Sequence, residues 1–231
     1  MTDTAIDPRT FLIRSAGAMH APLSEAQAAR LLDYLELIQK WNKVYNLTAV
    51  RNPADMLTHH LLDSLAVIAP LRRHIAATKH ATAPEARIRL LDVGSGAGLP
   101  GVVIAIGCPE IDVTCVDTVA KKAAFIQQVA VTLKLPNLRG VHDRVERLTG
   151  PFDVISSRAF ASLVDFVAGS SAALAAGGLW LAMKGKHPAD EIAALPAGIQ
   201  VFHVEPLQVT GLDAERCIVW MREAPTTAPA A

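Results

Sequence analysis

The sequence predicts an α/β fold in which a mostly parallel sheet of seven strands ends in an antiparallel pair at one edge and follows a helical N-terminal extension. Two observations carry this prediction. Helical patterns fill most of residues 1–80, whereas from residue 88 onward short apolar runs alternate with segments of helix length. Strands that alternate with helices in this way are typical of βαβ units, whose strands are parallel.

The N-terminal extension, residues 1–80, is expected to form helices that pack on the core. A first helix is expected over 8–18. Ser24 opens a capping box that starts a second helix, which carries a long apolar stripe. Asn52 and Pro53 mark another helix start, because asparagine suits the cap and proline the first helical position.

The core is expected to span residues 81–223. Its strands are predicted over seven apolar runs, 88–93, 113–116, 138–141, 154–156, 179–183, 201–204 and 217–221. Its helices are predicted over 101–107, 119–134 and 162–176. No helical pattern separates the last two strands, so we expect them to pair antiparallel at one edge. The polar segment 79–87 is interpreted as a connection, and 224–231 as a disordered tail.

The composition excludes several classes of protein. The chain has 231 residues, 51% of them hydrophobic, which is enough for one large core. It holds no run of about 18 apolar residues and no secretory signal, so we expect a cytoplasmic protein with no membrane partner. The formal net charge is zero, but residues 1–90 carry 11 Lys and Arg against 8 Asp and Glu. This asymmetry fits either an N-terminal side that faces nucleic acid or a solvated helix surface.

A glycine-rich loop follows the first predicted strand, with the sequence Asp92-Val93-Gly94-Ser95-Gly96-Ala97-Gly98-Leu99-Pro100-Gly101. Glycines let the chain turn sharply and let a ligand approach the backbone closely. Doubly wound sheets bind nucleotides at this place, beyond the carboxyl end of the first strand. The second strand ends at Asp117, whose carboxylate can accept hydrogen bonds from both hydroxyls of an adenosine ribose. A tight turn would explain the glycines alone, but the whole succession of strand, loop, helix, strand and acid predicts a ligand site.

Two ligands fit this pattern. Gly96-x-Gly98-x-x-Gly101 matches the dinucleotide fingerprint, which predicts an NAD-dependent oxidoreductase. Asp92, however, lies two residues before Gly94, and its carboxylate would repel a pyrophosphate. The same carboxylate attracts the ammonium group or the sulfonium of S-adenosylmethionine, directly or through water. The sequence therefore favours S-adenosylmethionine, bound at Asp92, Gly94, Gly96 and Gly98. A non-catalytic RNA- or nucleotide-binding regulator on the same fold stays open.

Several motifs, in order along the chain, resemble the ribosomal RNA small subunit methyltransferase G family, also called glucose-inhibited division protein B. They are Lys40-Trp41-Asn42-Lys43-Val44-Tyr45-Asn46-Leu47-Thr48, His60-x-x-Asp63-Ser64, the glycine loop, Arg144-Val145-Glu146, Ser157-Arg158-Ala159-Phe160 and Lys184-Gly185. The resemblance runs from about residue 25 to residue 222. It implies a class I S-adenosylmethionine-dependent methyltransferase that methylates N7 of one guanine in the 530 loop of 16S ribosomal RNA, in the small ribosomal subunit. S-adenosylhomocysteine is then the other product.

The resemblance also implies where the cofactor is held. The implied contacts are Gly94, Leu99, Asp117, Thr118, Val145, Glu146 and Arg158. Arg158 is the expected catalytic residue, since it follows the fourth strand, where the substrate must approach the methyl group. Its guanidinium can hold a phosphate, guanine O6 or the cofactor carboxylate. We expect it to be exposed; a surface arginine paired with a nearby acid is the alternative. Glu146 suits the adenine or a neighbouring amide, unless it is only an exposed glutamate at a helix start.

Methylation at guanine N7 needs no general base, because N7 attacks with a free lone pair and loses no proton. The sequence agrees, since it has neither an Asp-Pro-Pro-Tyr nor an Asn-Pro-Pro-Tyr box, which would suit an exocyclic amine. The rate is then expected to come mainly from proximity and alignment. Cys108 is the one candidate for a cysteine nucleophile, and it lies beside the first crossover helix, apart from the catalytic edge.

RNA contacts are expected from four basic residues, Lys40, Lys43, Arg51 and Arg144. An exposed aromatic among them, Trp41 or Tyr45, could stack on a splayed base, although Trp41 continues an apolar stripe and so is expected to pack in the core. His59 and His60 with Asp63 do not predict a metal site, since adjacent histidines point to different sides of a helix. We expect no metal and a monomer.

Overall fold

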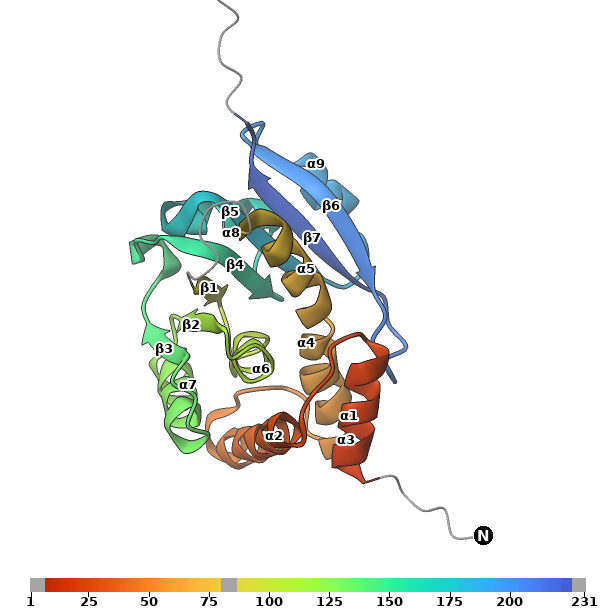
Figure 1. Cartoon of the computed structure of the whole chain (residues 1–231). Helices are drawn as coiled ribbons and strands as arrows, with labels where there is room; N and C mark the ends of the chain where they lie inside the picture. Colours follow the sequence, from red (N-terminus) through yellow and green to blue (C-terminus); the bar gives the residue numbers. More distant parts are fainter. Residues whose placement is uncertain (1–6, 80–86, 226–231) are drawn as a thin grey trace, which may run out of the picture.

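The computed structural model describes residues 7–79 and 87–225, and its seven strands form a single sheet (Figure 1). The strands are β1 (Ile88–Val93), β2 (Ile111–Asp117), β3 (Leu138–His142), β4 (Phe152–Arg158), β5 (Leu174–Lys184), β6 (Ile199–Leu207) and β7 (Arg216–Glu223). The α-helices are α1 (Pro8–Ala18), α2 (Glu25–Tyr45), α3 (Pro53–Met56), α4 (Asp63–Leu65), α5 (Ile68–Lys79), α6 (Gly101–Gly107), α7 (Ala120–Thr132), α8 (Leu163–Ser170) and α9 (Ala189–Ala193). The π-helical turn η1 (Leu57–Leu62) joins α3 to α4, and η2 (Val145–Arg147) and η3 (Ser171–Ala173) are 3₁₀ turns.

The strand order is β3-β2-β1-β4-β5-β7-β6. The first five strands in this order are parallel, and β7 runs antiparallel to both β5 and β6. The predicted antiparallel pair at one edge is therefore confirmed. The order reverses between β1 and β4, and ligands of open α/β sheets bind in the crevice beyond the carboxyl ends of strands at such a point.

The two faces of the sheet are covered by different helices. Leu90 of β1 belongs to a buried apolar cluster that includes residues of α6, α7 and the N-terminal helices, whereas its neighbour Leu91 belongs to a second cluster that includes residues of α8. In Figure 1, α2 and α4 lie beside α6. The N-terminal helices thus share the core of the sheet and help to form the wall of any site above β1.

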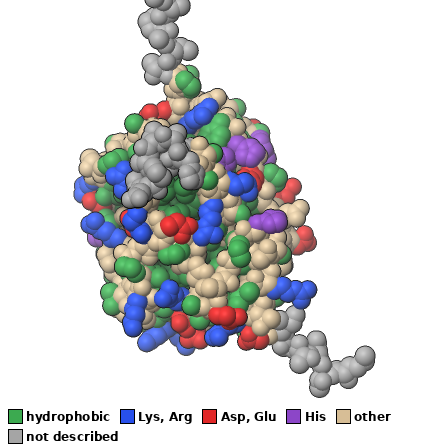
Figure 2. Space-filling view, viewed as in Figure 1, with side chains coloured by type: hydrophobic (Ala, Val, Ile, Leu, Met, Phe, Trp, Pro, Cys, Tyr) green, Lys and Arg blue, Asp and Glu red, His purple; other side chains and the backbone are tan. Residues whose placement is uncertain are grey.

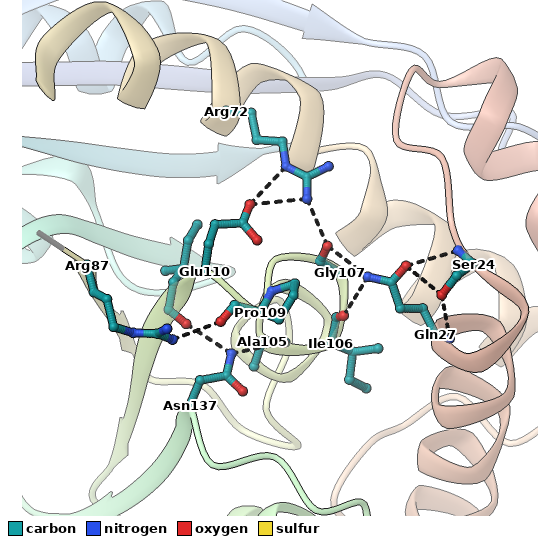
Figure 3. Close-up of polar contacts among 11 residues, drawn as sticks. Ser24, Gln27, Arg72, Arg87, Ala105, Ile106, Gly107, Pro109, Glu110 and Asn137 are labelled. Atoms are coloured by element: carbon teal, nitrogen blue, oxygen red, sulfur yellow. Dashed lines mark hydrogen bonds and ion pairs between the residues drawn. The ribbon is translucent and has the colours of Figure 1, made fainter. Parts of the chain in front are cut away.

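Side chains from three elements cap the C-terminal end of α6 (Figure 3). Gln27 Nε2 of α2 and Arg72 Nη2 of α5 both donate to the carbonyl oxygen of Gly107, at 3.1 and 3.0 Å. Asn137 Nδ2, just before β3, donates to the carbonyl oxygen of Ala105 at 3.0 Å. The last carbonyls of a helix have no partner within it. These contacts fix the helix whose other end continues the glycine loop.

Most predicted elements are confirmed, including α1 and α6 with the expected bounds. The helix predicted over 162–176 is too long, because α8 ends at Ser170 and β5 begins at Leu174. Leu174 pairs with Phe152 of β4 across an irregular register, so strand pairing overrides the helix preference of the neighbouring alanines. The sequence also missed α9.

Two further expectations are only partly open to comparison. Most of the connection predicted over 79–87 and of the tail predicted over 224–231 lies outside the described residues. Trp41 is half-buried and packs against the core, as expected from its place in the apolar stripe. None of the helices in the described ranges is long and apolar enough to cross a membrane.

Candidate active site

Two cavities meet at the glycine loop, above the carboxyl ends of the parallel strands, and both include Gly94 in their walls. The larger, here called the central cavity, has a volume of about 560 Å³. Its walls come from the loop (Gly94–Ala97, Leu99), from the N-terminal region (Leu47, Thr48, Val50, His59, His60, Asp63) and from strand ends (Arg158, Met183, Lys184, Arg216). The smaller, the side cavity, has a volume of about 250 Å³ and is lined by Asp117, Thr118, Lys122, Asp143, Val145, Glu146 and Phe160, among others.

Three glycines of the loop have positive φ angles, and two of them, Gly94 and Gly96, line a cavity. Gly94 and Gly96 have φ angles of +62° and +59°, which other residues adopt only at a cost. A Cβ atom on Gly94 would lie 2.6 Å from a ring carbon of Phe160. A Cβ atom on Gly96 would meet no atom nearer than 4.0 Å. Since Gly96 lines the central cavity, a side chain there would occupy space open to a ligand.

Asp92 lies beneath the loop and is fully buried. Its carboxylate accepts hydrogen bonds from Gly101 N at 3.1 Å and from Ser156 Oγ at 2.8 Å. Burial raises the pKa of Asp92 to about 7, although both hydrogen bonds oppose the shift. Asp92 is in the wall of neither cavity, and its carboxylate contacts the start of α6 and β4. The residue holds the loop and the start of α6 in place.

This arrangement disfavours a dinucleotide. The pyrophosphate of a dinucleotide lies against free amides at the N-terminus of the first helix. Here the backbone amide of Gly101, the first residue of α6, already donates to the buried carboxyl group of Asp92. That amide is therefore not free for a phosphate, so the loop suits a ligand without phosphates better than a dinucleotide.

The side cavity combines apolar surface with three carboxylates and a lysine, and Asp117 is the most firmly held of the carboxylates. Asp117 Oδ2 accepts from Gly96 N at 3.0 Å and Oδ1 accepts from Val119 N at 2.9 Å, so the residue is fixed at the end of β2. Val145 and Phe160 supply apolar surface nearby. Such a site suits an adenosine, whose ring is flat and apolar on its faces and whose ribose carries two hydroxyls. Four residues predicted as cofactor contacts lie together here: Asp117, Thr118, Val145 and Glu146.

Arg158 is not the exposed arginine that the sequence predicted. Its side chain is 20% exposed, and Nη1 donates to Asp63 Oδ2 and to the carbonyl oxygen of His59, both at 2.9 Å. Arg216 Nε donates to the other carboxylate oxygen of Asp63 at 2.9 Å. Arg158 therefore pairs with an acid, as in the alternative, but it is not a surface residue, and it lines the central cavity. Two guanidinium groups share one carboxylate, which leaves this wall with a net positive charge.

The chain as a whole is similar to known proteins. The family described as rRNA small subunit methyltransferase G matches residues 27–219. A ribosomal RNA small subunit methyltransferase G from Acidovorax sp. (strain JS42) is 68% identical over 211 residues, which cover 91% of this chain and 93% of that protein. One from Albidiferax ferrireducens is 71% identical over 204 residues, which cover 87% and 91%. The chain belongs to this family.

Membership of the ribosomal RNA small subunit methyltransferase G family confirms the resemblance found in the sequence, and with it an S-adenosylmethionine-dependent methyltransferase. The fold agrees. The crystal structure of TrmN from Thermus thermophilus superposes with a TM-score of 0.55 at 20% identity, over 73% of this chain and 53% of that one. At this identity the likeness shows the fold alone.

The hydrogen bond of His60 and the ion pair of Arg216 are parts of the site that the sequence did not predict. His60 lies in η1, and its Nε2 is 2.9 Å from Thr48 Oγ1. Thr48 N in turn donates to Asn42 Oδ1 at 3.0 Å, so the segment after α2 is fastened to η1. Burial and the nearby Arg158 lower the pKa of His60 to about 4, so the ring is neutral at pH 7. The spacing of His60 and Asp63 was visible in the sequence, but nothing there indicated that Arg216 would join them.

The other predicted site residues are more dispersed. Leu99 lines the central cavity, whereas Gly98 lines neither cavity. A Cβ atom on Gly98 would lie 2.5 Å from Val102 Cγ2 and 3.3 Å from Tyr34 Oη, so the position faces the packed interior. The four residues predicted to bind RNA are exposed and outside both cavities: Lys40, Lys43, Arg51 and Arg144. Residues 7–79 and 87–225 contain no group of three or more His, Cys, Asp or Glu placed to hold a metal ion.

Proposed function

We propose that this methyltransferase transfers the methyl group of S-adenosylmethionine to N7 of a guanine in the 530 loop of 16S ribosomal RNA. The observation that carries the proposal is the pair of cavities that meet at Gly94. One suits an adenosine, and the other is large enough for a purine and has cationic walls. The family resemblance supplies the identity of the RNA and of the nitrogen.

The residues of the loop fit the cofactor. In this proposal Asp117 binds the ribose, Val145 and Glu146 surround the adenine, and the cofactor passes Gly96 into the central cavity. When bound, S-adenosylmethionine supplies a methyl group on a cationic sulfur. Arg158 uses one nitrogen for Asp63 and His59, which leaves N–H groups on Nε and Nη2 for the carboxylate of the cofactor.

The central cavity needs no general base for attack by N7. The cofactor would supply the methyl group together with its positive charge, and N7 would lose no proton, so no residue of the cavity would have to accept one. The polar groups of the cavity agree with this chemistry: Asp63 is held by two arginines, and Lys184 Nζ lies 2.7 Å from Glu191 Oε2. These groups act by fixing the geometry of approach, which is where most of the rate is expected to come from.

The substrate is proposed to approach over the exposed cations Lys40 and Lys43 of α2, over Arg51 before α3, and over Arg144 after β3. In this proposal the protein acts as a monomer in the cytoplasm, where small subunits are assembled. Because phosphate contacts release counterions, binding of the RNA should weaken as salt is raised.

The product is the first test. Borohydride reduces the ring of 7-methylguanosine, and aniline then cleaves the RNA chain at that position. RNA from cells that lack the gene should therefore lose one cleavage site in the 530 loop. The wild-type gene should restore the site, and Gly96→Val should not. An unchanged cleavage pattern in the deletion strain would contradict the substrate and leave the cofactor site standing. Calorimetry with S-adenosylhomocysteine and with NADH tests the cofactor separately, and tight binding of NADH would contradict it.

A further inference from the structure

An exposed aromatic residue lies at the rim of the active site. Tyr45 ends α2 and is 39% exposed, and its neighbour Val44 is 70% exposed. Two residues later, Leu47 enters the wall of the central cavity. Among the described residues, Val131 near the end of α7 is the other large apolar side chain that is exposed. Tyr45 is thus an exposed ring two residues from the wall of the central cavity.

The ring of Tyr45 is supported from the protein side. Its centroid lies 5.1 Å from that of Trp41, and Trp41 in turn lies 5.3 Å from Phe125 of α7. Helix α2, which carries Tyr45 and Trp41, also contacts the glycine loop, because Tyr34 Oη donates to the carbonyl oxygen of Ala97 at 2.6 Å. The aromatic packing and this hydrogen bond therefore fix the position of Tyr45 relative to the loop.

The surroundings of the ring are cationic. Lys121 Nζ lies 6.0 Å from the centroid of Tyr45, over its face. Lys122, the next residue of α7, lines the side cavity. Arg51 donates to Asn46, the residue after Tyr45, at 2.9 Å. Across the described residues, no ion pair joins a carboxylate to Lys43, Arg51 or Lys121. On the face shown in Figure 2, cations and carboxylates are interspersed.

We propose that Tyr45 is a stacking platform for the base of a nucleotide next to the target guanosine, and that Lys121 binds the phosphate of that nucleotide. This inference rests on the proposed function. A guanine that enters the central cavity must leave its stack, and the bases beside it lose a stacking partner. Aromatic side chains and neighbouring cations replace such contacts in proteins that bind single-stranded RNA. A docking protein would need a wider apolar patch than one ring and one valine.

The stacking step is tested by methyl transfer to small ribosomal subunits from a strain that lacks the enzyme. Tyr45→Ala should lower kcat/KM about five- to hundredfold, the range for loss of one base–aromatic stack. Tyr45→Phe and Tyr45→Trp should stay within about threefold of wild type, since both keep a ring. Affinity for S-adenosylhomocysteine should be the same in all of them, and Val131→Ala is the matched control for an exposed apolar residue.

Three outcomes would overturn the inference: full activity of Tyr45→Ala, loss in Tyr45→Phe as large as in Tyr45→Ala, or a parallel loss of affinity for S-adenosylhomocysteine. The second would assign the role to the hydroxyl, and the third to the glycine loop. If the wild-type protein transferred no methyl group to small subunits, the proposed function itself would be wrong, and this inference with it.

The phosphate contact has its own test on the same helix. Lys121→Gln should reduce the slope of log affinity against log salt, for binding of small-subunit RNA, by about 0.7–0.9, the value for one phosphate contact. Lys134→Gln removes a charge just beyond the other end of α7 and should leave the slope unchanged. Equal slopes for Lys121→Gln and wild type would remove Lys121 from the RNA site.

Discussion

Gly94 and Gly96 share a backbone conformation, but they meet different surroundings, and only one of them bears on ligand binding alone. Gly94 is pressed against Phe160, so a side chain there would displace the ring and disturb the side cavity. Gly96 faces open space in the central cavity. A substitution at Gly96 therefore separates binding from packing more cleanly than one at Gly94.

Gly96→Val should lower the affinity for S-adenosylhomocysteine by at least about tenfold, because the new side chain occupies the path of the ligand. The left-handed backbone should cost about 1–2 kcal/mol of unfolding free energy. Gly177 is the matched control, since its φ is +73° and a Cβ atom on it would meet nothing within 4 Å. Gly177→Val should carry a similar stability cost and bind the ligand as wild type does. Calorimetry and urea unfolding of both variants provide the check, and normal binding by Gly96→Val would remove the loop from the site.

At the scale of single residues, the sequence placed candidate contacts on one continuous motif and missed the ion pairs that join distant parts of the chain. The loop glycines and Asp117 follow from the order of strand, loop and strand. Arg158 was expected to be exposed, because a strand end gives no sign of which carboxylate will approach it. Its partner Asp63 is 95 positions away in the sequence, and Arg216 reaches Asp63 across 153 positions.

At the scale of elements, the turn η1 is the feature that the sequence could not predict. A π-helical turn looks like an ordinary helix in the apolar pattern, and such turns are frequent at functional sites. η1 carries His59 and His60 into the wall of the central cavity, with Asp63 following at once in α4. The predicted boundary between α8 and β5 was wrong for a related reason. An alanine-rich segment can form a helix or a strand, and pairing with a neighbouring strand determines which one forms.

The neutral His60 makes the stability of this element depend on pH. Its pKa is about 4 in the folded chain and about 6.5 when exposed to water, so the unfolded chain binds a proton between these values and the folded chain does not. His60 therefore contributes stability that is complete above about pH 6.5 and is lost as the pH falls toward 4. Asp92 acts in the opposite direction, because its raised pKa makes the folded chain the better proton binder between about 4 and 7.

His60→Gln should flatten the loss of unfolding free energy between pH 7 and pH 5, by at most about 1.4 kcal/mol for each pH unit. Urea unfolding at the two pH values gives the measurement. His187→Gln, which changes an exposed histidine outside the cavity, is the control and should keep the wild-type slope. If His60→Gln and wild type lost the same free energy on acidification, the neutral buried ring would have no part in the pH dependence.

At the scale of the whole molecule, the N-terminal helices are part of the catalytic domain rather than an appendage. Their apolar residues lie in the same cluster as those of α6 and α7, and Gln27 and Arg72 cap α6. The net charge of zero conceals an uneven distribution around the active site. Within residues 7–79 and 87–225, no carboxylate pairs with Lys43, Arg51 or Lys121, whereas Arg158 and Arg216 share one. A chain with no overall charge can therefore present a positive rim to RNA.

Asp63 joins three parts of the chain, because it lies on α4 and binds Arg158 of the parallel sheet and Arg216 of the antiparallel pair. Its side chain is 5% exposed, so removing the charge leaves two guanidinium groups without their counterion in a largely buried place. Breaking a buried ion pair from one side costs roughly 3–5 kcal/mol. The arginines retain some access to water, so Asp63→Asn should lower the free energy of unfolding by about 2–4 kcal/mol.

Arg216→Gln should cost less, about 1–2 kcal/mol, because Arg158 still balances Asp63. The surface pair of Arg87 and Asp112, at 2.8 Å, is the control, and Asp112→Asn should change stability by less than about 1 kcal/mol. Urea unfolding of the three variants ranks them, with Asp63→Asn the least stable and Asp112→Asn the closest to wild type. If Asp63→Asn unfolded at the wild-type urea concentration, the carboxylate would not be what holds the N-terminal helices to the two halves of the sheet. Arg158 would then owe its position in the cavity to the carbonyl of His59 alone, and methyl transfer by Asp63→Asn should be normal as well.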